Sequence, residues 1–119
     1  MSGEQSLTPE ASVPPEPPVT AVDGALVHFA GEIDLTSIER FRNAIRAAEA
    51  KGGNMIIDLR AATFIDSTGI SALIGAAHHA AERTSRVTVQ VTQPMMRRVF
   101  AMMQLDSMLI VEPPLTAAD

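Results

Sequence analysis

Hydrophobic positions recur along this chain in short runs separated by polar or glycine-rich breaks. Apolar runs at residues 19–22 and 25–30 surround an Asp-Gly pair, and Asp-Gly between two such runs favours a β-hairpin. The continuous apolar run at 55–59 is typical of a strand that is covered on both faces. Residues 87–91 alternate with a period of two, and a last short run follows at 108–111. These five runs are predicted to be strands.

Three other segments repeat apolar residues every three or four positions, which predicts helices with one buried face. They begin near Thr36, Ile70 and Pro94. Thr36 and Glu39 have the spacing of a capping box, and the glycine pair at 52–53 should end the first helix. Proline suits the first turn of the third helix.

The apolar faces of these three helices are predicted from their spacing. The residues expected to be buried are Ile38, Phe41, Ala44 or Ile45, and Ala48 in the first helix, Ile70, Leu73, Ile74, Ala77 and Ala81 in the second, and Met95 or Met96, Val99, Phe100 and Met103 in the third.

The predicted elements follow the order β-β-α-β-α-β-α-β, with residues 31–35 leaving the second strand as a loop. Strands that alternate with helices over short links form parallel sheets with right-handed crossovers. The sequence therefore predicts an α/β fold with a mixed, mostly parallel sheet, in which the initial hairpin adds one antiparallel edge.

The two ends of the chain differ from its centre. Residues 1–18 are rich in proline and glutamate and have no periodic apolar pattern, so we expect a disordered tail. One domain is expected at residues 19–112, in keeping with a length of 119 residues. A proline pair begins the segment 113–119, which is predicted to be a loose C-terminal tail.

Charge and composition exclude several kinds of partner. The formal net charge is −5, which opposes nucleic acid or an anionic membrane as the main partner because both favour a basic surface. The chain has no cysteine, so it has neither disulfides nor thiolate metal sites. There is no apolar stretch of about 20 residues and no signal-peptide pattern. We therefore expect a cytoplasmic protein.

The most informative stretch is 64–70, Phe-Ile-Asp-Ser-Thr-Gly-Ile, between an apolar strand and a helix. Asp66 or Ser67 is expected at the helix cap. A hydroxyl exposed at such a helix N-terminus would also be well placed to carry added negative charge. Asp34 and Asp58 come late in or after predicted strands, where ligands bind in α/β folds.

Catalytic and metal-binding uses of these residues find little support. The strand-helix joint lacks a Gly-x-Gly-x-x-Gly pattern, and the only lysine is Lys51, so no phosphate-binding loop is present. Ser67 is not part of a Gly-x-Ser-x-Gly elbow. His78 and His79 are adjacent and would point about 100° apart on a helix. We predict a protein that is not an enzyme, with no catalytic residues, no metal and no cofactor.

Three motifs together resemble the anti-sigma factor antagonist family, the STAS-domain proteins. Gly-Glu-Ile-Asp at 31–34 is similar to the family's Gly-Glu-Leu-Asp signature, and 55–59 is similar to its central strand. The stretch 64–70 is similar to its Phe-x-Asp-Ser-Ser-Gly-Leu phosphorylation motif. The resemblance covers residues 19–111, although the proline pair at 113–114 leaves a C-terminal helix common in the family short or absent.

The resemblance implies a fold, a partner and a switch. The fold is a sheet of four or five strands faced by helices. The partner is an anti-sigma factor with a kinase-like ATPase domain, which the unphosphorylated antagonist binds so that the sigma factor is released. Ser67 matches the family's phosphoacceptor, with Thr68 as second choice, and phosphorylation there prevents binding. The partner-binding face would comprise Asp34, Asp66, Ser67, Thr68 and Gly69.

The same resemblance sets wider expectations. The protein would regulate transcription by partner switching in a bacterial stress response, as a monomer or weak dimer. Two alternatives stay open: an accessory STAS subunit of a transport complex for lipids or anions, and a component of a stressosome-like scaffold.

Overall fold

The computed structural model describes residues 25–119. The tail predicted at 1–18, the strand predicted at 19–22 and the Asp-Gly turn of the hairpin lie outside the described residues. In order, the elements are β1 (Ala25–His28), β2 (Gly31–Ile33), α1 (Ile38–Glu49), β3 (Met55–Asp58), β4 (Ala62–Ile65), α2 (Ser67–Glu82), β5 (Val87–Gln90), α3 (Pro94–Met102), the 3-10 helix η2 (Leu105–Ser107) and β6 (Ile110–Glu112).

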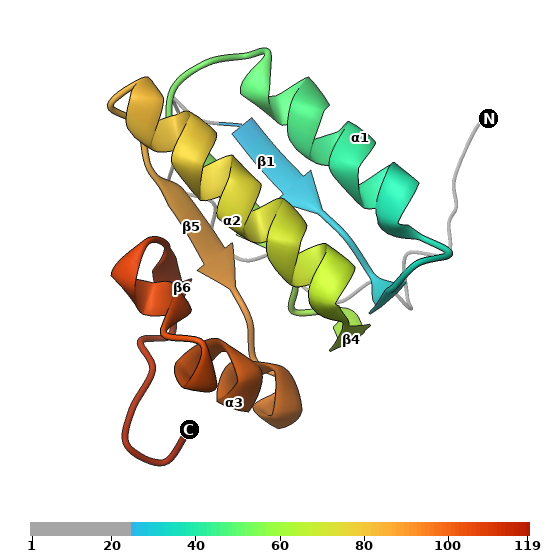
Figure 1. The fold of residues 1–119 in the computed structure, drawn as a ribbon, viewed down its shortest axis with the longest axis vertical. Helices are drawn as coiled ribbons and strands as arrows, with labels where there is room; N and C mark the ends of the chain where they lie inside the picture. Colours follow the sequence, from blue (N-terminus) through green and yellow to red (C-terminus); the bar gives the residue numbers. More distant parts are fainter. Residues whose placement is uncertain (1–24) are drawn as a thin grey trace, which may run out of the picture.

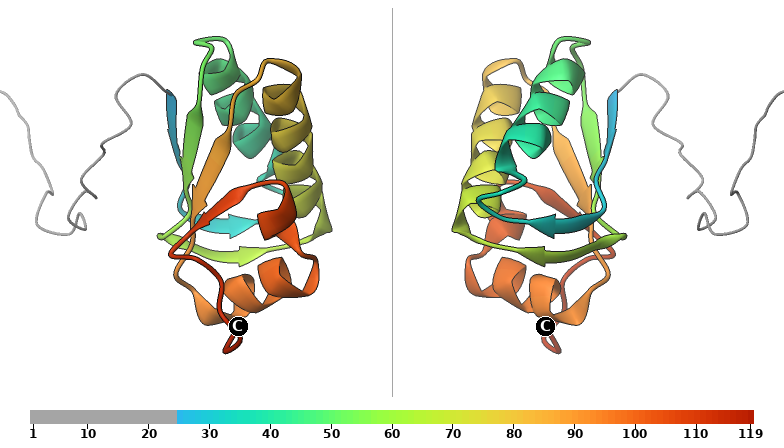
Figure 2. Two further views of the ribbon diagram at one scale, coloured as in Figure 1. Left: turned by 90° about the vertical axis from the view of Figure 1, so that its left-hand side faces the viewer. Right: turned by 90° about the vertical axis from the view of Figure 1, so that its right-hand side faces the viewer.

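The main sheet contains four of the described strands in the order β1-β3-β5-β6, and each neighbouring pair is parallel. Helices α1 and α2 lie side by side on one face of this sheet (Figures 1 and 2). Val27, Ile57 and Val89 are buried, as expected for strand positions of one parity that face packed helices. The predicted α/β fold, with a mostly parallel sheet faced by helices, is confirmed.

A second, two-stranded sheet pairs β2 with β4, also in parallel. The prediction that 31–35 is a loop is therefore wrong for its first three residues, and β4 was not predicted as a strand. Neither strand has a clear period of two. Within β2 only Ile33 is buried, while β4 has buried residues only at its two ends. Strands this short owe their pairing to the tertiary fold more than to their own pattern.

The core is mainly aliphatic, and the helices contribute to it mostly through the predicted faces. Two residues expected to be buried, Ala81 in α2 and Met103 after α3, are instead exposed, because each lies on the solvent side near the end of its helix. In α1 the buried residues are Ile38, Phe41, Ile45 and Ala48, as the spacing predicted. Phe41 meets Phe29 edge-to-face, with ring centroids 5.1 Å apart. In α3, Met96 is buried and Met95 is exposed, which decides between the two methionines that the spacing allowed.

The start of α1 differs from the predicted capping box. The helix begins at Ile38 after Ser37, so Thr36 lies before the cap and its hydroxyl donates instead to the carboxylate of Asp34. Ser37 turns its own hydroxyl back to donate to the carbonyl oxygen of Glu32, at 2.7 Å. The residues of the turn therefore bond to one another and to β2, and Glu39 is too early in the helix to complete the box.

The C-terminal segment is tied to the body of the protein by Arg97 in α3. Its guanidinium donates to the Asp119 carboxylate at 2.9 and 3.1 Å and to the carbonyl oxygens of Val91, Pro113 and Pro114 at 2.8 to 3.0 Å. These contacts were not anticipated by the prediction of a loose tail. Within the described part of the chain, no helix follows β6.

Replacing this arginine should release the C-terminal segment. In Arg97→Ala the exposed backbone N–H of Thr116, which donates to Asp119, should exchange with solvent about tenfold faster or more, because hydrogen bonds to a charged group are the stronger kind. Hydrogen–deuterium exchange measures this rate. The control is Arg98→Ala, which removes the same charge from the exposed neighbour. Equal exchange in both variants would contradict the role given to Arg97.

Candidate functional site

The ends of β2 and β4 bring two distant motifs together. Ile33 pairs with Ile65, and the backbone N–H of Asp66 donates to the carbonyl oxygen of Ile33 at 2.9 Å. The turn that carries Asp34 therefore lies beside the joint that carries Ser67. Figure 1 shows β4 at the N-terminal end of α2.

Asp66 caps α2. Its side-chain oxygen accepts hydrogen bonds from the backbone N–H groups of Thr68 and Gly69, at 2.9 and 3.2 Å. The same oxygen accepts a hydrogen bond from the Thr68 hydroxyl. The sequence allowed either Asp66 or Ser67 at the cap, and the structure shows that Asp66 is the cap. The Thr68 hydroxyl is engaged as a hydrogen-bond donor to the same carboxylate.

Ser67 is the first residue of α2 and its side chain is exposed. Among the described residues, no group hydrogen bonds to its hydroxyl, in contrast to the hydroxyl of Thr68. The first N–H groups of a helix have no partners within the helix and give this end a partial positive charge. The hydroxyl is therefore open to solvent at the electropositive end of a sixteen-residue helix.

Asp34 and Asp66 make this corner negatively charged. The Thr36 hydroxyl lowers the pKa of Asp34 by its hydrogen bond, and this outweighs the effect of burial. The Thr68 hydroxyl lowers the pKa of Asp66 in the same way, opposed by burial and by the charge of Asp34. Both carboxylates are thus ionised at neutral pH, and they lie close enough for one to influence the titration of the other.

Gly69, expected on the partner-binding face, is buried. A Cβ atom at this position would lie 2.6 Å from Cγ1 of Ile65 and 2.7 Å from Cγ2 of Ile33. Even a methyl group there would force the side chains of Ile65 and Ile33 to shift, because α2 lies very close to β2 and β4. The glycine therefore sets the position of the helix N-terminus and presents no side chain to a partner.

The third candidate carboxylate, Asp58, belongs to a different environment. It is buried at the end of β3, where it accepts hydrogen bonds from the Arg60 side chain at 3.0 and 3.1 Å and lies 3.2 Å from Nδ1 of His28. Burial raises its pKa, but the bonds from Arg60 and His28 lower it overall. This aspartate links the end of β1 to the residues that follow β3 and is not part of the Asp34–Asp66 corner.

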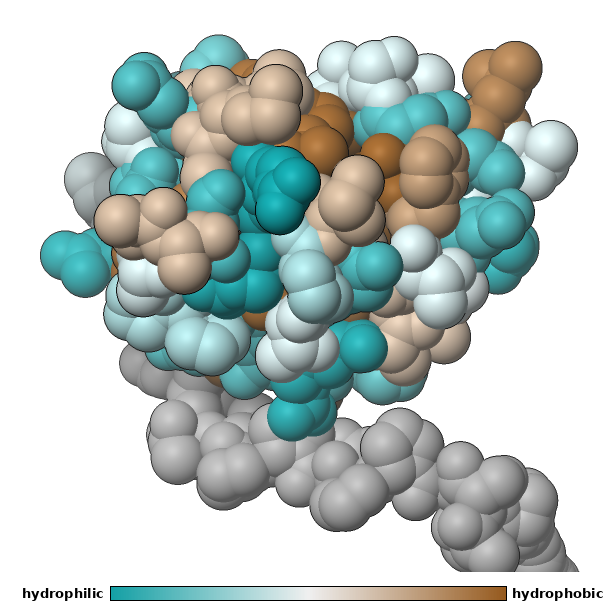
Figure 3. All heavy atoms as spheres, turned by 90° about the horizontal axis from the view of Figure 1, so that it is seen from below, coloured by the Kyte–Doolittle hydropathy of each residue, from teal (hydrophilic) through white to brown (hydrophobic). Residues whose placement is uncertain are grey.

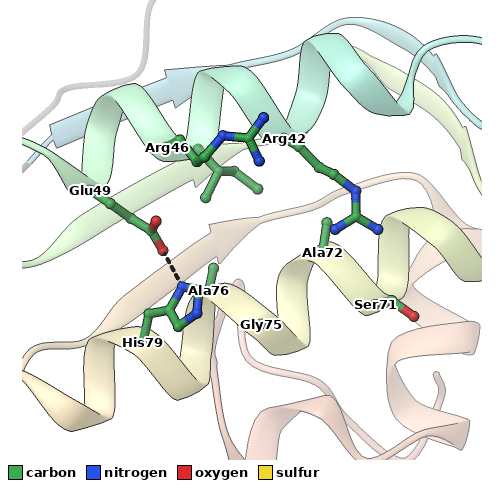
Figure 4. Close-up of a pocket in the computed structure, with 9 residues that line it drawn as sticks. Arg42, Arg46, Glu49, Ser71, Ala72, Gly75, Ala76 and His79 are labelled. Carbon is green, nitrogen blue, oxygen red and sulfur yellow. Dashed lines mark hydrogen bonds and ion pairs between the residues drawn. The ribbon is translucent and has the colours of Figure 1, made fainter.

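A shallow groove between α1 and α2 contains one of the two adjacent histidines (Figure 4). Nδ1 of His79 lies 3.0 Å from a carboxylate oxygen of Glu49 and links the two helices. Small residues such as Ala72 and Gly75 are among those that line the groove. Within residues 25–119 there is no group of three or more His, Cys, Asp or Glu side chains arranged to hold a metal ion. The His79–Glu49 contact is a polar contact between two helices at the surface.

Apolar side chains also reach the surface near the Ser67 corner, which the sequence pattern did not predict. Phe64, Met95 and Leu35 are 49%, 61% and 75% exposed. Figure 3 shows hydrophobic side chains among hydrophilic ones on the underside of the molecule. The sequence offered no clear signal for this exposure, because β4 has no alternating pattern and Phe64 is directly followed by the buried Ile65.

No helix in the described part of the chain has the length and apolar character needed to cross a membrane.

Comparison with known proteins gives one family. A profile of the STAS domain matches residues 16–118. Among solved structures, the chain is similar to an anti-sigma factor antagonist from Mycobacterium paratuberculosis, with 30% identity and a TM-score of 0.69 over 81% of this chain and 83% of that one. It also shares the fold of the anti-sigma factor antagonist SpoIIAA in its unphosphorylated form, with 23% identity and a TM-score of 0.56 over 66% of this chain and 74% of that one.

Two glycines of α2 offer a matched test of how the helix is positioned. Gly69→Ala should destabilise the protein by about 1–3 kcal/mol, because its Cβ would overlap Ile65 and Ile33. Gly75→Ala should be neutral or stabilising by up to about 1 kcal/mol, because its Cβ would meet nothing within 4 Å and alanine favours helix. Urea denaturation measures both. Similar effects of the two substitutions would contradict the close approach at Gly69.

Proposed function

The chain belongs to the STAS domain family, and we propose that it acts as an anti-sigma factor antagonist. In this proposal it binds an anti-sigma factor that has a kinase-like ATPase domain, and binding releases the sigma factor. Phosphorylation of Ser67 by that partner ends the interaction. The observation that carries the proposal is the exposed Ser67 hydroxyl, free of hydrogen bonds within the described chain, on the first residue of α2 beside two carboxylates.

Ser67 is favoured over Thr68 as the phosphoacceptor. A kinase needs a hydroxyl that it can reach and deprotonate. Thr68 is half-buried and its hydroxyl donates a hydrogen bond to Asp66. Phosphorylation of Thr68 would therefore require the loss of a hydrogen bond to the residue that caps the helix. The exposed Ser67 hydroxyl can be phosphorylated without disturbing that cap.

The fold should tolerate a phosphate at this position. A phosphoserine carries a charge of about −1.5 to −2 at neutral pH, and the N-terminus of a helix stabilises negative charge. Asp34 and Asp66 repel the phosphate, but Ser67 is exposed, so the phosphate can extend into solvent. We therefore expect little change in structure on modification.

Binding, by contrast, should be strongly affected. Two carboxylates already lie at this corner, and the phosphate would roughly double its negative charge. A partner surface that packs against Ser67 would have to remove water from these charges, which costs several kcal/mol without a matched cation. A loss of about 4 kcal/mol weakens binding about a thousandfold. The switch needs no conformational change.

The expected setting is the cytoplasm of a bacterium, with the protein as a monomer or weak dimer in a stress-response pathway. This is where a kinase-like anti-sigma factor and its ATP would meet the antagonist. A direct contact with nucleic acid is not part of the proposal.

Phosphorylation is tested with purified proteins. The chain is mixed with ATP and each anti-sigma factor with a kinase-like ATPase domain encoded in its genome, and the phosphate is located by mass spectrometry. We expect it on Ser67, and none on the Ser67→Ala variant. Ser67→Glu should fold normally and bind the partner about a hundredfold more weakly or worse, as measured by calorimetry.

Ser107→Glu is the matched control, since it adds the same charge to an exposed serine near the opposite end of α2, where Ser107 shares a hollow with Ala81 and Ser85. It should bind like the wild type. Phosphate on neither Ser67 nor Thr68, or capture of only a transport protein or a megadalton scaffold, would contradict the proposed function.

A further inference from the structure

A hollow of about 240 Å³ lies between β4 and α3, next to the Ser67 corner. Its lining is mostly apolar and comes from both elements. The residues are Thr63, Phe64, Ile65, Gln93, Met95, Met96 and Val99.

Two large apolar residues that line this hollow, Phe64 and Met95, are exposed to solvent. Phe64 and Met95 are 49% and 61% exposed, whereas their chain neighbours Ile65 and Met96 are 6% and 2% exposed. Ile65 and Met96 therefore belong to the core, whereas Phe64 and Met95 expose apolar surface to solvent around the hollow. Aromatic and methionine side chains exposed in this way are enriched at protein interfaces.

The size of the hollow suits a protein side chain better than a small molecule. Sites for cofactors and drug-sized ligands usually have volumes of about 300–1,000 Å³ and a few convergent polar groups. This hollow is smaller, and its polar residues are limited to Thr63 and Gln93. The Gln93 side-chain oxygen already caps α3 by accepting from the backbone N–H of Met96 at 2.8 Å.

The hollow is also continuous with the proposed contact face. Phe64 and Ile65 lead directly into Asp66 and Ser67 along the chain, because β4 ends at Ile65 and α2 begins at Ser67. A protein that covers the Ser67 hydroxyl therefore approaches the hollow as well.

We propose that this hollow receives an apolar side chain of the anti-sigma factor and anchors it beside Ser67. This inference rests on the proposed function and adds to it the apolar part of the interface. Such anchors in desolvated pockets supply most of the affinity of protein interfaces, with charged groups at the rim. The flexible Met95 side chain can adapt its shape to the anchor. Phosphorylation then acts on the charged rim while the apolar pocket is unchanged.

The test compares two exposed methionines of α3. Met95→Glu places a charge in the hollow, and Met102→Glu places the same charge at a position 76% exposed that is not part of the lining. With the anti-sigma factor identified by phosphorylation of Ser67, Met95→Glu should weaken binding about tenfold or more, and Met102→Glu should leave it unchanged. Phe64→Ala, which adds no charge, should also weaken binding about tenfold.

The possible outcomes separate the two proposals. If wild type binds and is phosphorylated on Ser67 but Met95→Glu and Phe64→Ala bind equally well, the pocket inference fails and the proposed function stands. If no anti-sigma factor binds the wild type, both fail. If the wild type dimerises in sedimentation experiments and Met95→Glu alone makes it monomeric, the hollow is occupied by a second copy and the inference is overturned. Thermal melts of the variants, unchanged from wild type, show that binding losses do not reflect unfolding.

Discussion

The pairing of β2 with β4 is the constraint on which the rest of the site depends. The hydrogen bond from the Asp66 backbone to Ile33 fixes the end of one strand against the other. Gly69 then allows α2 to approach both strands so closely that even a methyl group there would force neighbouring side chains to move. As a result, two acidic turns far apart in the sequence share one corner of the molecule, and the first residue of α2 is presented there.

At this corner, hydrogen bonds give the two aspartates and the neighbouring hydroxyl residues different roles. Asp66 caps the helix and occupies the Thr68 hydroxyl, while Asp34 holds its own turn through Thr36. Both carboxylates stay ionised, which keeps the corner negative. Ser67 takes part in none of these bonds among the described residues. The same interactions that stabilise the start of the helix leave one hydroxyl unbonded, so the proposed phosphorylation would not compete with capping.

The sequence pattern predicted most of the main sheet and all three helices, because these elements carry several apolar residues at regular spacing. It did not predict β2 and β4, whose three and four residues lack alternation and pair only through long-range contacts. The motif residues were predicted, but their roles needed coordinates: Gly69 is a packing residue, and Met95 is exposed where the helical period also allowed burial. The spacing of apolar residues along a helix does not determine which of two adjacent side chains is buried in the core.

A phosphate on Ser67 is proposed to change binding without changing the fold. The most direct measurement is a comparison of amide chemical shifts, by heteronuclear NMR, of the protein before and after phosphorylation. We expect shift changes confined to the two turns, at residues 33–37 and 64–70, with the strands of the main sheet unaffected. Changes that extend through β1, β3 and β5 would show that the fold itself responds, and would contradict a switch based on the charge of the contact face alone.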